Sequence, residues 1–354
     1  MDNTIRLKDI AKMAKVSVGT VDRVIHKRGE VSIESYKKVM AIVEKTGYKP
    51  NLIAQSLGNH KTFRIVAVLP DASQDEYWNM AYEGVMNAQK NWSQYGISIK
   101  ILFFNLYDKN AFKKTFKAAI KLKPDALLTA PLFYQEAVEY LEICRSNKIP
   151  FALFNNNIPK SSALTFIGQD LYVSGIVGAE LLHIDQKGAG TYAILHIYDD
   201  IQNSVHLSEK EKGFKKYFSN NGHNKCKVVS MDLNLRHERT LEKELDQLLN
   251  ITDLKGILVT TSKGASIVSK LLEKHGKNGI RLVAYDLLEQ NILYLKKGII
   301  DFLINQNSKR QAFTGITQIA NHLVFKKEVG PVYHFPLEII TRGNLKSYLD
   351  WMEH

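Results

Sequence analysis

The sequence predicts a small all-α region followed by a larger α/β region of doubly wound parallel sheets in two lobes. Near the N-terminus, apolar residues recur at the three- and four-residue spacing of one helix face. From about residue 63 onward, short apolar runs alternate with amphipathic segments, which is the rhythm of buried parallel strands joined by helices. These strand and helix repeats are too numerous for one sheet of ordinary size, so two lobes are expected.

The first two helices are predicted at residues 7–14 and 18–25. In the first, Leu7, Ile10, Ala11 and Ala14 fall at i, i+3, i+4 and i+7. Ser17 follows a break in that pattern and is placed to cap the N-terminus of the second helix. The pattern indicates helix, tight turn, helix.

The second helix has two chemically different faces. Val21, Val24 and Ile25 point to one side with Val18 at its edge, and the other side carries Gly19, Asp22, Arg23 and His26. A DNA major groove is about 12 Å wide and admits one helix, and Arg and Asp can read base edges there. A surface helical hairpin with a neighbouring Asp22–Arg23 pair has the same pattern, so the pattern alone leaves both interpretations open.

A third helix and a short fourth helix complete the N-terminal region. Ser32 is placed to cap the third helix, which Gly47 ends. Its apolar stripe is Tyr36, Val39, Met40 and Val43. Residues 52–57 predict a helix too short to be stable alone, which suggests a hinge that orders against a partner. The expected domains are a headpiece at 1–50, a hinge and linker at 51–62, and an effector and dimerisation domain at 63–354.

Charge and cysteine content limit the class of protein. The net charge is +12, and residues 1–64 hold 13 Lys and Arg against 6 Asp and Glu, a balance of +7 that suits phosphate contacts. Cys144 and Cys226 lack metal or redox spacing and are expected to be core thiols. No signal segment or long apolar run is found, so a soluble cytoplasmic protein without membrane contact is expected.

The N-terminal residues resemble the headpiece and hinge of LacI/GalR transcription regulators over about 60 contiguous positions. The matching segments are Lys8-Asp9-Ile10-Ala11, Val16-Ser17, Thr20-Val21, Arg23-Val24, Gly47-Tyr48, Pro50-Asn51, Ala54 and Leu57. The resemblance implies that Ser17, Thr20 and His26 lie near phosphates, and that Val18, Gly19, Asp22 and Arg23 lie near major-groove bases. It also implies that Leu57 wedges into the minor groove. Arg6, where a phosphate-binding Thr is common, and Asn51 complete the predicted DNA-binding set.

Base preference cannot be taken from the family, because this chain departs from it at Val18, Gly19 and Asp22. We expect Arg23 to read a guanine and Asp22 either to accept from cytosine N4 or to orient Arg23. Pairing on the helix surface is the alternative for Asp22. For Leu57 the alternative is a dimer contact within the hinge.

Polar residues follow the predicted strands of the α/β region, where ligands bind in such sheets. Asp75-Glu76-Tyr77-Trp78 follows the first strand, Asn155-Asn156-Asn157 follows residues 151–154, and Asp286 and Gln306 follow later strands. Aromatic rings beside amides and carboxylates suit a polyhydroxylated ligand, whose C–H faces stack and whose hydroxyls need donors and acceptors. The sequence therefore predicts a sugar-like ligand.

This region also resembles the periplasmic sugar-binding fold of the ribose-binding type. The matching segments are Asp75-Glu76-Tyr77-Trp78, Gly168-Gln169-Asp170, Gly213-Phe214, Tyr285-Asp286, Ile304-Asn305-Gln306 and Glu338-Ile339-Ile340-Thr341-Arg342. The resemblance implies that Tyr77 and Trp78 stack on the ligand. The implied hydrogen-bonding positions are Asp75, Asn155, Thr261, Asp286 and Gln306.

Three departures from that pattern bear on the ligand. Asn155-Asn156 replaces an Asp-Arg pair, Lys210 replaces an Arg, and Thr261 replaces an Asn. An amide pair lacks the charged bidentate contacts of carboxylate and guanidinium, so another neutral sugar or a cyclitol is expected in place of ribose.

Structural roles are the alternatives for several of these residues. Tyr77 and Trp78 would then be core side chains, Asp286 a cap for a helix from Leu287, and Gln306 a partner for backbone at the lobe crossing. Asp170 is expected to cap a helix beginning near Leu171. No metal, cofactor or catalytic role is assigned, and His183, His196 and His206 receive none.

The expected function is a transcription regulator, favoured as a repressor, that binds a near-palindromic operator as a homodimer. A small effector between the lobes would switch its operator affinity. A transport or chemotaxis sugar-binding protein would show a secretion signal and no headpiece. A sugar-modifying enzyme would need an acid/base pair, and Asn155-Asn156 removes one carboxylate.

Overall fold

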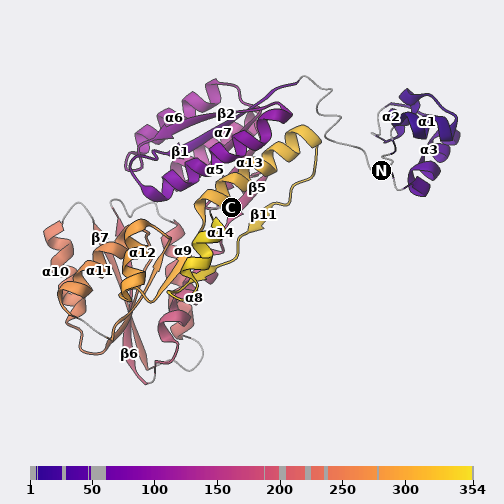
Figure 1. Ribbon diagram of the computed structural model, residues 1–354. Coiled ribbons are helices and arrows are strands. Elements are labelled where there is room, and N and C mark those ends of the chain that lie inside the picture. Colours follow the sequence, from indigo (N-terminus) through magenta and orange to yellow (C-terminus); the bar gives the residue numbers. More distant parts are fainter. Residues whose placement is uncertain are drawn as a thin grey trace. The chain divides into compact units, whose positions relative to one another are not determined.

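The computed structural model describes residues 5, 7–25, 29–46, 48, 61–186, 188–198, 205–219, 225–234, 238–276 and 279–352. The chain divides into two compact units, Met1–His60 and Lys61–His354 (Figure 1).

The described residues of the first unit form three short helices, as predicted. They are α1 (Leu7–Ala14), α2 (Val18–Ile25) and α3 (Ile33–Thr46). The Ser17 hydroxyl accepts a hydrogen bond from the Thr20 N–H at 3.1 Å and thereby caps α2. The small core consists of Ile10, Ala11, Ala14, Val21, Val24 and Val39. The predicted stripe of α3 is wrong at Tyr36, which is 44% exposed. The predicted hinge helix at 52–57 lies outside the described residues.

The second unit contains two six-stranded sheets, which confirms the predicted doubly wound α/β fold. The first sheet has the order β11-β5-β4-β3-β1-β2 and the second the order β12-β10-β9-β8-β6-β7. The strands of the first sheet are β1 (Phe63–Pro70), β2 (Ile97–Phe104), β3 (Ala126–Thr129), β4 (Phe151–Phe154), β5 (Thr165–Gly168) and β11 (Val332–His334). Those of the second are β6 (Gly190–Tyr198), β7 (Cys226–Asn234), β8 (Leu254–Val259), β9 (Arg281–Tyr285), β10 (Phe302–Asn305) and β12 (Glu338–Ile340).

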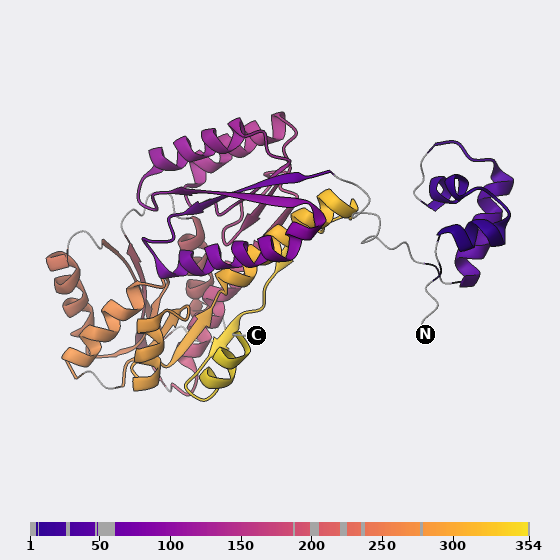
Figure 2. The same cartoon turned by 45° about the horizontal axis from the view of Figure 1, so that its top comes forward.

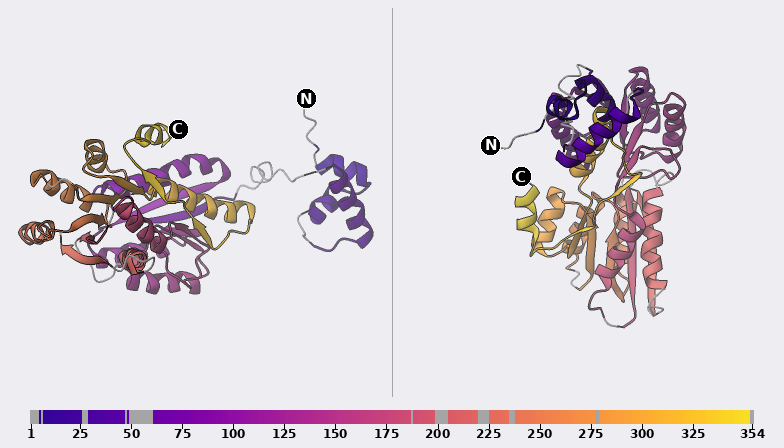
Figure 3. Two further views of the ribbon diagram at one scale, coloured as in Figure 1. Left: turned by 90° about the horizontal axis from the view of Figure 1, so that it is seen from below. Right: turned by 90° about the vertical axis from the view of Figure 1, so that its right-hand side faces the viewer.

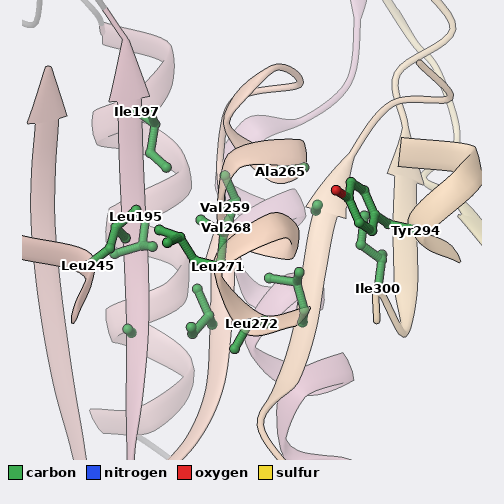
Figure 4. Packing of buried hydrophobic residues seen from close by; sticks show 14 of the residues in the cluster. Leu195, Ile197, Leu245, Val259, Ala265, Val268, Leu271, Leu272, Tyr294 and Ile300 are labelled. Carbon is green, nitrogen blue, oxygen red and sulfur yellow. The ribbon is translucent and has the colours of Figure 1, made fainter. Parts of the chain in front are cut away.

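Helices cover both faces of each sheet (Figures 2 and 3). The first sheet is packed by α5 (Glu76–Trp92) and α13 (Ser308–Phe325) on one face and by α6 (Lys109–Lys121) and α7 (Tyr134–Ser146) on the other. On the second sheet, α8 (Leu171–His183) and α9 (Val205–Ser219) form one layer, and α10 (Glu238–Leu249), α11 (Gly264–Lys274), α12 (Glu289–Lys297) and α14 (Leu345–Met352) form the other. Figure 4 shows the second layer, in which Leu195 and Val259 of the sheet pack against Leu245, Leu271 and neighbouring side chains.

The two lobes repeat one topology. Strands β1 to β5 and strands β6 to β10 have the same order within their sheets. The chain passes between the lobes after β5, after β10 and after β11. As a result, β4 and β9 hold the same place in their sheets, and the residues that follow them are equivalent in the two lobes.

The prediction that both cysteines are core thiols is correct for one and wrong for the other. Cys144 is buried as a core thiol, whereas Cys226 is only partly buried. Asp170 caps α8, as predicted, because its carboxylate accepts a hydrogen bond from the Val173 N–H at 3.0 Å.

Among the described residues, no helix combines the length and apolar character needed to cross a bilayer.

Candidate functional site

Helix α2 presents a polar face away from its buried valines. Val18 is 49% exposed, and Gly19 and Arg23 are also exposed, whereas Val21 and Val24 are buried. A Cβ added to Gly19 would meet nothing closer than the Ser17 hydroxyl at 3.8 Å, so packing within the chain does not require glycine there. This face is therefore a shallow surface with one exposed guanidinium.

The structure describes some of the other residues that were predicted to bind DNA. Ser17 is exposed, Thr20 is half-buried, and their hydroxyls lie 2.9 Å apart. Burial raises the pKa of the Tyr48 phenol, and the nearby Asp22 carboxylate raises it further, so Asp22 has a neighbour besides Arg23. Arg6, His26, Asn51 and Leu57 lie outside the described residues.

Asn155 and Asp286 occupy the same place in the two lobes. Each residue directly follows the fourth strand of its lobe, with φ of 66° and 68° respectively. The Asn155 N–H donates to the Ile167 carbonyl at 3.0 Å, and the Asp286 N–H donates to the Ile304 carbonyl at 3.1 Å. Left-handed backbone is uncommon for residues other than glycine, and it often marks a functional site.

The Asp286 carboxylate is fully buried and accepts hydrogen bonds from protein groups. The Gln306 N–H and side-chain amide donate to its two oxygens at 2.9 and 2.8 Å, and the Ser262 hydroxyl also donates. Burial raises the pKa of this carboxyl, although the hydrogen bonds oppose the shift. The alternative of a helix cap is wrong, because α12 begins at Glu289 and has Leu288 at its N-cap position.

Lys210 is a buried cation beside this carboxylate. Its ammonium lies 3.4 Å from the centroid of the Tyr285 ring and donates to the Thr260 carbonyl at 3.1 Å. Burial lowers the pKa of Lys210 to about 7, although the charge of Asp286 opposes the shift. Thr261 follows Thr260, and its hydroxyl donates to the Ile197 carbonyl at 2.8 Å.

Tyr77 and Trp78 lie on the first lobe and are each 6% exposed. Their rings meet edge to face with centroids 5.0 Å apart, and Trp78 also contacts Phe154 with centroids 6.2 Å apart. The Asn155 side-chain amide donates to the Tyr77 hydroxyl. Asn156 is buried next to Asn155. Both aromatic rings therefore belong to the packed core, while Tyr77 also joins the polar group around Asn155.

Gln311 of α13 joins the polar residues of the two lobes. Its side-chain oxygen accepts from the Asn155 N–H at 2.9 Å, and its amide donates to the Gln306 carbonyl at 2.7 Å. The sequence reasoning missed this residue. It lies about one turn into α13, and only its spacing of five residues from Gln306 could have indicated it.

Asp75 caps α5 and forms an ion pair with a lysine of the second lobe. One oxygen accepts from the Tyr77 N–H at 2.9 Å and caps α5, and the other lies 3.2 Å from the Lys263 ammonium. Lys263, at the N-terminus of α11 in the second lobe, also donates to the Gln74 carbonyl at 2.6 Å. Lys263 therefore joins the lobes directly. The sequence reasoning missed it because α11 is remote from Asp75 in the chain.

Two families match the chain in succession. The family described as bacterial regulatory proteins, lacI family, matches residues 6–51. The family described as periplasmic binding protein domain matches residues 66–327. The two matches fall on the three-helix unit and on the two-lobed unit.

Curated relatives are similar over part of their length. The HTH-type transcriptional regulator DegA of Bacillus subtilis is 30% identical over 152 residues, which cover 43% of this chain and 44% of that protein. Catabolite control protein A of Staphylococcus aureus is 33% identical over 78 residues, which cover 22% of this chain and 24% of that protein. The chain thus spans less than half the length of these curated relatives.

Solved structures match the two-lobed fold. A putative LacI transcriptional regulator from Bacteroides fragilis has a TM-score of 0.74 and 27% identity, covering 81% of this chain and 100% of that one. A glucose-galactose binding protein, GanP, from Geobacillus stearothermophilus has a TM-score of 0.71 and 20% identity, covering 80% and 99%, and shows the fold alone. The chain therefore belongs to the family described as periplasmic binding protein domain, and it carries a lacI-family domain over residues 6–51, ahead of that match.

Proposed function

We propose that this protein is a sequence-specific DNA-binding transcription regulator, acting as a repressor, whose operator affinity is switched by a small neutral sugar or cyclitol bound between its lobes. The observation that carries the DNA-binding part is the two-faced helix α2. Val21 and Val24 are buried in the small core with residues of α1 and α3, while Val18, Arg23 and the backbone at Gly19 are exposed. A helix with one packed face and one exposed polar face is the element that enters a major groove.

Gly19 and the two hydroxyls at the start of α2 fit this role. Packing does not require a glycine at position 19, so its lack of a side chain suits close approach to a partner. Ser17 and Thr20 stand at the N-terminus of the helix, where phosphates are favoured by free N–H groups and by the helix dipole. Arg6, His26, Asn51 and Leu57 remain predicted DNA contacts.

The test of base reading is Arg23→Ala, measured with a selected DNA site and with random DNA of the same length. If Arg23 reads a guanine, the variant should bind the selected site about 5- to 150-fold more weakly, the equivalent of about 1–3 kcal/mol, with little change on random DNA. Lys45→Ala, an exposed lysine of α3, is the matched control. Equal selectivity for wild type and Arg23→Ala would contradict the assignment.

The effector part rests on the polar residues at the carboxyl ends of the strands. Asp286, Gln306, Asn155 and Lys210 are buried together with aromatic rings, and the lobes are joined there by Gln311 and by Lys263. A ligand that exchanges hydrogen bonds with these groups would change the contacts between lobes. Because the amides at Asn155 and Asn156 are neutral, a neutral polyhydroxylated ligand is favoured.

A homodimer completes the proposal, because two headpieces address two half-sites of a near-palindrome. The first lobe offers an outer strand, β2, that bears an exposed aromatic side chain. Phe103 is 41% exposed and lies against Tyr82 of α5 with ring centroids 5.7 Å apart. An apolar outer strand of this kind suits pairing with a second copy.

A further inference from the structure

Six exposed cationic side chains lie where the parallel strands of the first sheet begin. We name this group the basic edge; it consists of Lys61, Arg64, Lys121, Lys123, Lys326 and Lys327. Its members come from three places in the chain: the start of β1, the segment between α6 and β3, and the segment after α13. The basic edge lies at the end of the first sheet where its parallel strands begin, and Asn155 lies at the other end, where they finish.

Side-chain contacts hold these segments together. The Lys61 and Lys326 ammonium groups lie 4.9 and 5.6 Å from the centroid of the same Phe63 ring. The Arg64 guanidinium donates to the Leu122 carbonyl at 3.1 Å, which places it beside the segment that carries Lys121 and Lys123. The six charges therefore form one surface around the start of β1.

Few acidic groups balance this surface. Asp125 is adjacent, but its carboxylate accepts from the Arg64 backbone N–H at 2.8 Å. Within the described ranges, none of the six side chains makes an ion pair within 4.0 Å. Like charges held close together raise the local positive potential, which favours the binding of a polyanion.

Helix capping explains only part of the cluster. Lys121 lies in the last turn of α6 and Lys326 is the C-cap residue of α13, where a cation is favoured by the helix dipole. Arg64 also serves the C-terminus of α6, because its guanidinium donates to the carbonyl of the C-cap residue Leu122. Lys61, Lys123 and Lys327 lie outside helices, so a position in the last turn of a helix does not explain their charges.

We propose that the basic edge binds the phosphate backbone of double-stranded DNA. The inference rests on the proposed function, because it needs DNA held by the helix-turn-helix unit. Lys61 is the first residue of the two-lobed unit, so the basic edge surrounds the point at which the chain enters that unit. Contacts to phosphates strengthen binding without adding sequence preference.

The test is the salt dependence of DNA binding by the full chain. Lys326→Gln with Lys327→Gln removes two charges from the basic edge. The matched control is Lys109→Gln with Lys114→Gln, two exposed lysines toward the opposite end of the same lobe. If both edge lysines contact phosphate, the slope of log K against log salt should become shallower by about 1.8, while the ratio of specific to random binding stays unchanged. The control pair should keep the wild-type slope.

The outcomes separate the two proposals. Equal slopes for wild type and both double variants, or equal losses in the edge and control pairs, would overturn the basic edge as a DNA contact. A wild-type protein that does not distinguish its selected site from random DNA would instead overturn the proposed function. Lys61→Gln with Lys121→Gln repeats the measurement on side chains that make no hydrogen bond within the described part of the chain, so loss of folding can be told apart from loss of contact.

Discussion

Lys210 and Asp286 are opposite charges whose burial disfavours both charged forms. Lys210 is 2% exposed, donates a hydrogen bond to the Thr260 carbonyl and lies over the Tyr285 ring. The Asp286 carboxylate accepts hydrogen bonds from three donor groups. Burying charge is costly unless it is paired or hydrogen-bonded. The arrangement therefore makes the stability of the second lobe depend on pH.

Lys210→Met should remove this pH dependence. The unfolded lysine keeps its proton up to about pH 10.4, whereas burial lowers the pKa of the folded one to about 7. Unfolding therefore takes up a proton between these pH values, and the free energy of unfolding rises with pH by at most about 1.4 kcal/mol per unit.

Urea unfolding between pH 7 and pH 10 measures this slope. Lys274→Met, an exposed lysine of α11, is the control and should keep the wild-type pH dependence. The same slope in wild type and Lys210→Met would show that the folded lysine titrates normally.

At the residue scale, the sequence predicted which residues cap helices better than it predicted which residues form long-range hydrogen bonds and ion pairs. The caps at Ser17 and Asp170 were predicted correctly, because a cap depends on neighbours within three residues. The partners of Asp75 and Asn155 are Lys263 and Gln311, which are remote in the chain. Only the fold brings such groups together.

Two glycines allow α8 and α9 to pack with their backbones in close approach. A Cβ on Gly175 of α8 would lie 1.9 Å from the Lys210 carbonyl oxygen, and a Cβ on Gly213 of α9 would lie 1.9 Å from the Tyr172 carbonyl oxygen. Each glycine thus faces the backbone of the other helix. Because Lys210 lies at this contact, the packing of the two helices also fixes the position of its side chain.

Gly175→Ala should destabilise the second lobe, because neither backbone can move without separating the helices. We expect a loss of about 1–3 kcal/mol in the free energy of unfolding, or more if the helices cannot shift. Gly330→Ala is the matched control, since its added Cβ would have no neighbour closer than 4.0 Å. It should change stability by less than about 0.5 kcal/mol. Similar unfolding curves for both variants would contradict the close packing of α8 and α9.

At the element scale, the sequence predicted the buried central strands and the outer strand β2, but it missed the outer strands β7 and β11. Strands β1, β3, β4 and β8 are almost wholly buried and appear as continuous apolar runs. Strand β7 is an outer strand with alternating exposure, and β11 is exposed along its length. An alternating or exposed strand has no continuous apolar run, so the pattern used for the central strands cannot detect it.

At the scale of the whole molecule, the proposed dimer requires a surface that a second copy can cover. Phe103→Glu places a charge on the exposed apolar part of β2. If this strand lies in the interface, the variant should sediment as a monomer at concentrations where the wild type is a dimer, because burying an unpaired charge is costly.

Sedimentation velocity at micromolar concentration measures the change. Val138→Glu is the control, because Val138 is 42% exposed on α7 of the same lobe. It should remain dimeric. A monomeric wild type would contradict the proposed dimer, and a dimeric Phe103→Glu would place the interface elsewhere.

The proposed switch joins the two units through DNA affinity and ligand affinity. A ligand can change operator binding only if it binds the two states of the protein unequally, and the operator must then change ligand affinity by the same factor. The contacts of Lys263 and Gln311 between lobes are where such a difference would arise. This reciprocity distinguishes a switch from two independent binding sites.

The most direct test is to measure the affinity for a selected operator by fluorescence anisotropy, with and without each neutral sugar or cyclitol that raises the melting temperature of the protein. The account predicts that one such ligand changes the operator Kd, typically about 5- to 150-fold, and that operator DNA changes the Kd of that ligand by the same factor. Asp286→Ala should abolish the effect of the ligand while leaving operator binding without ligand in place. A ligand that binds the protein tightly and leaves the operator Kd unchanged would contradict the account.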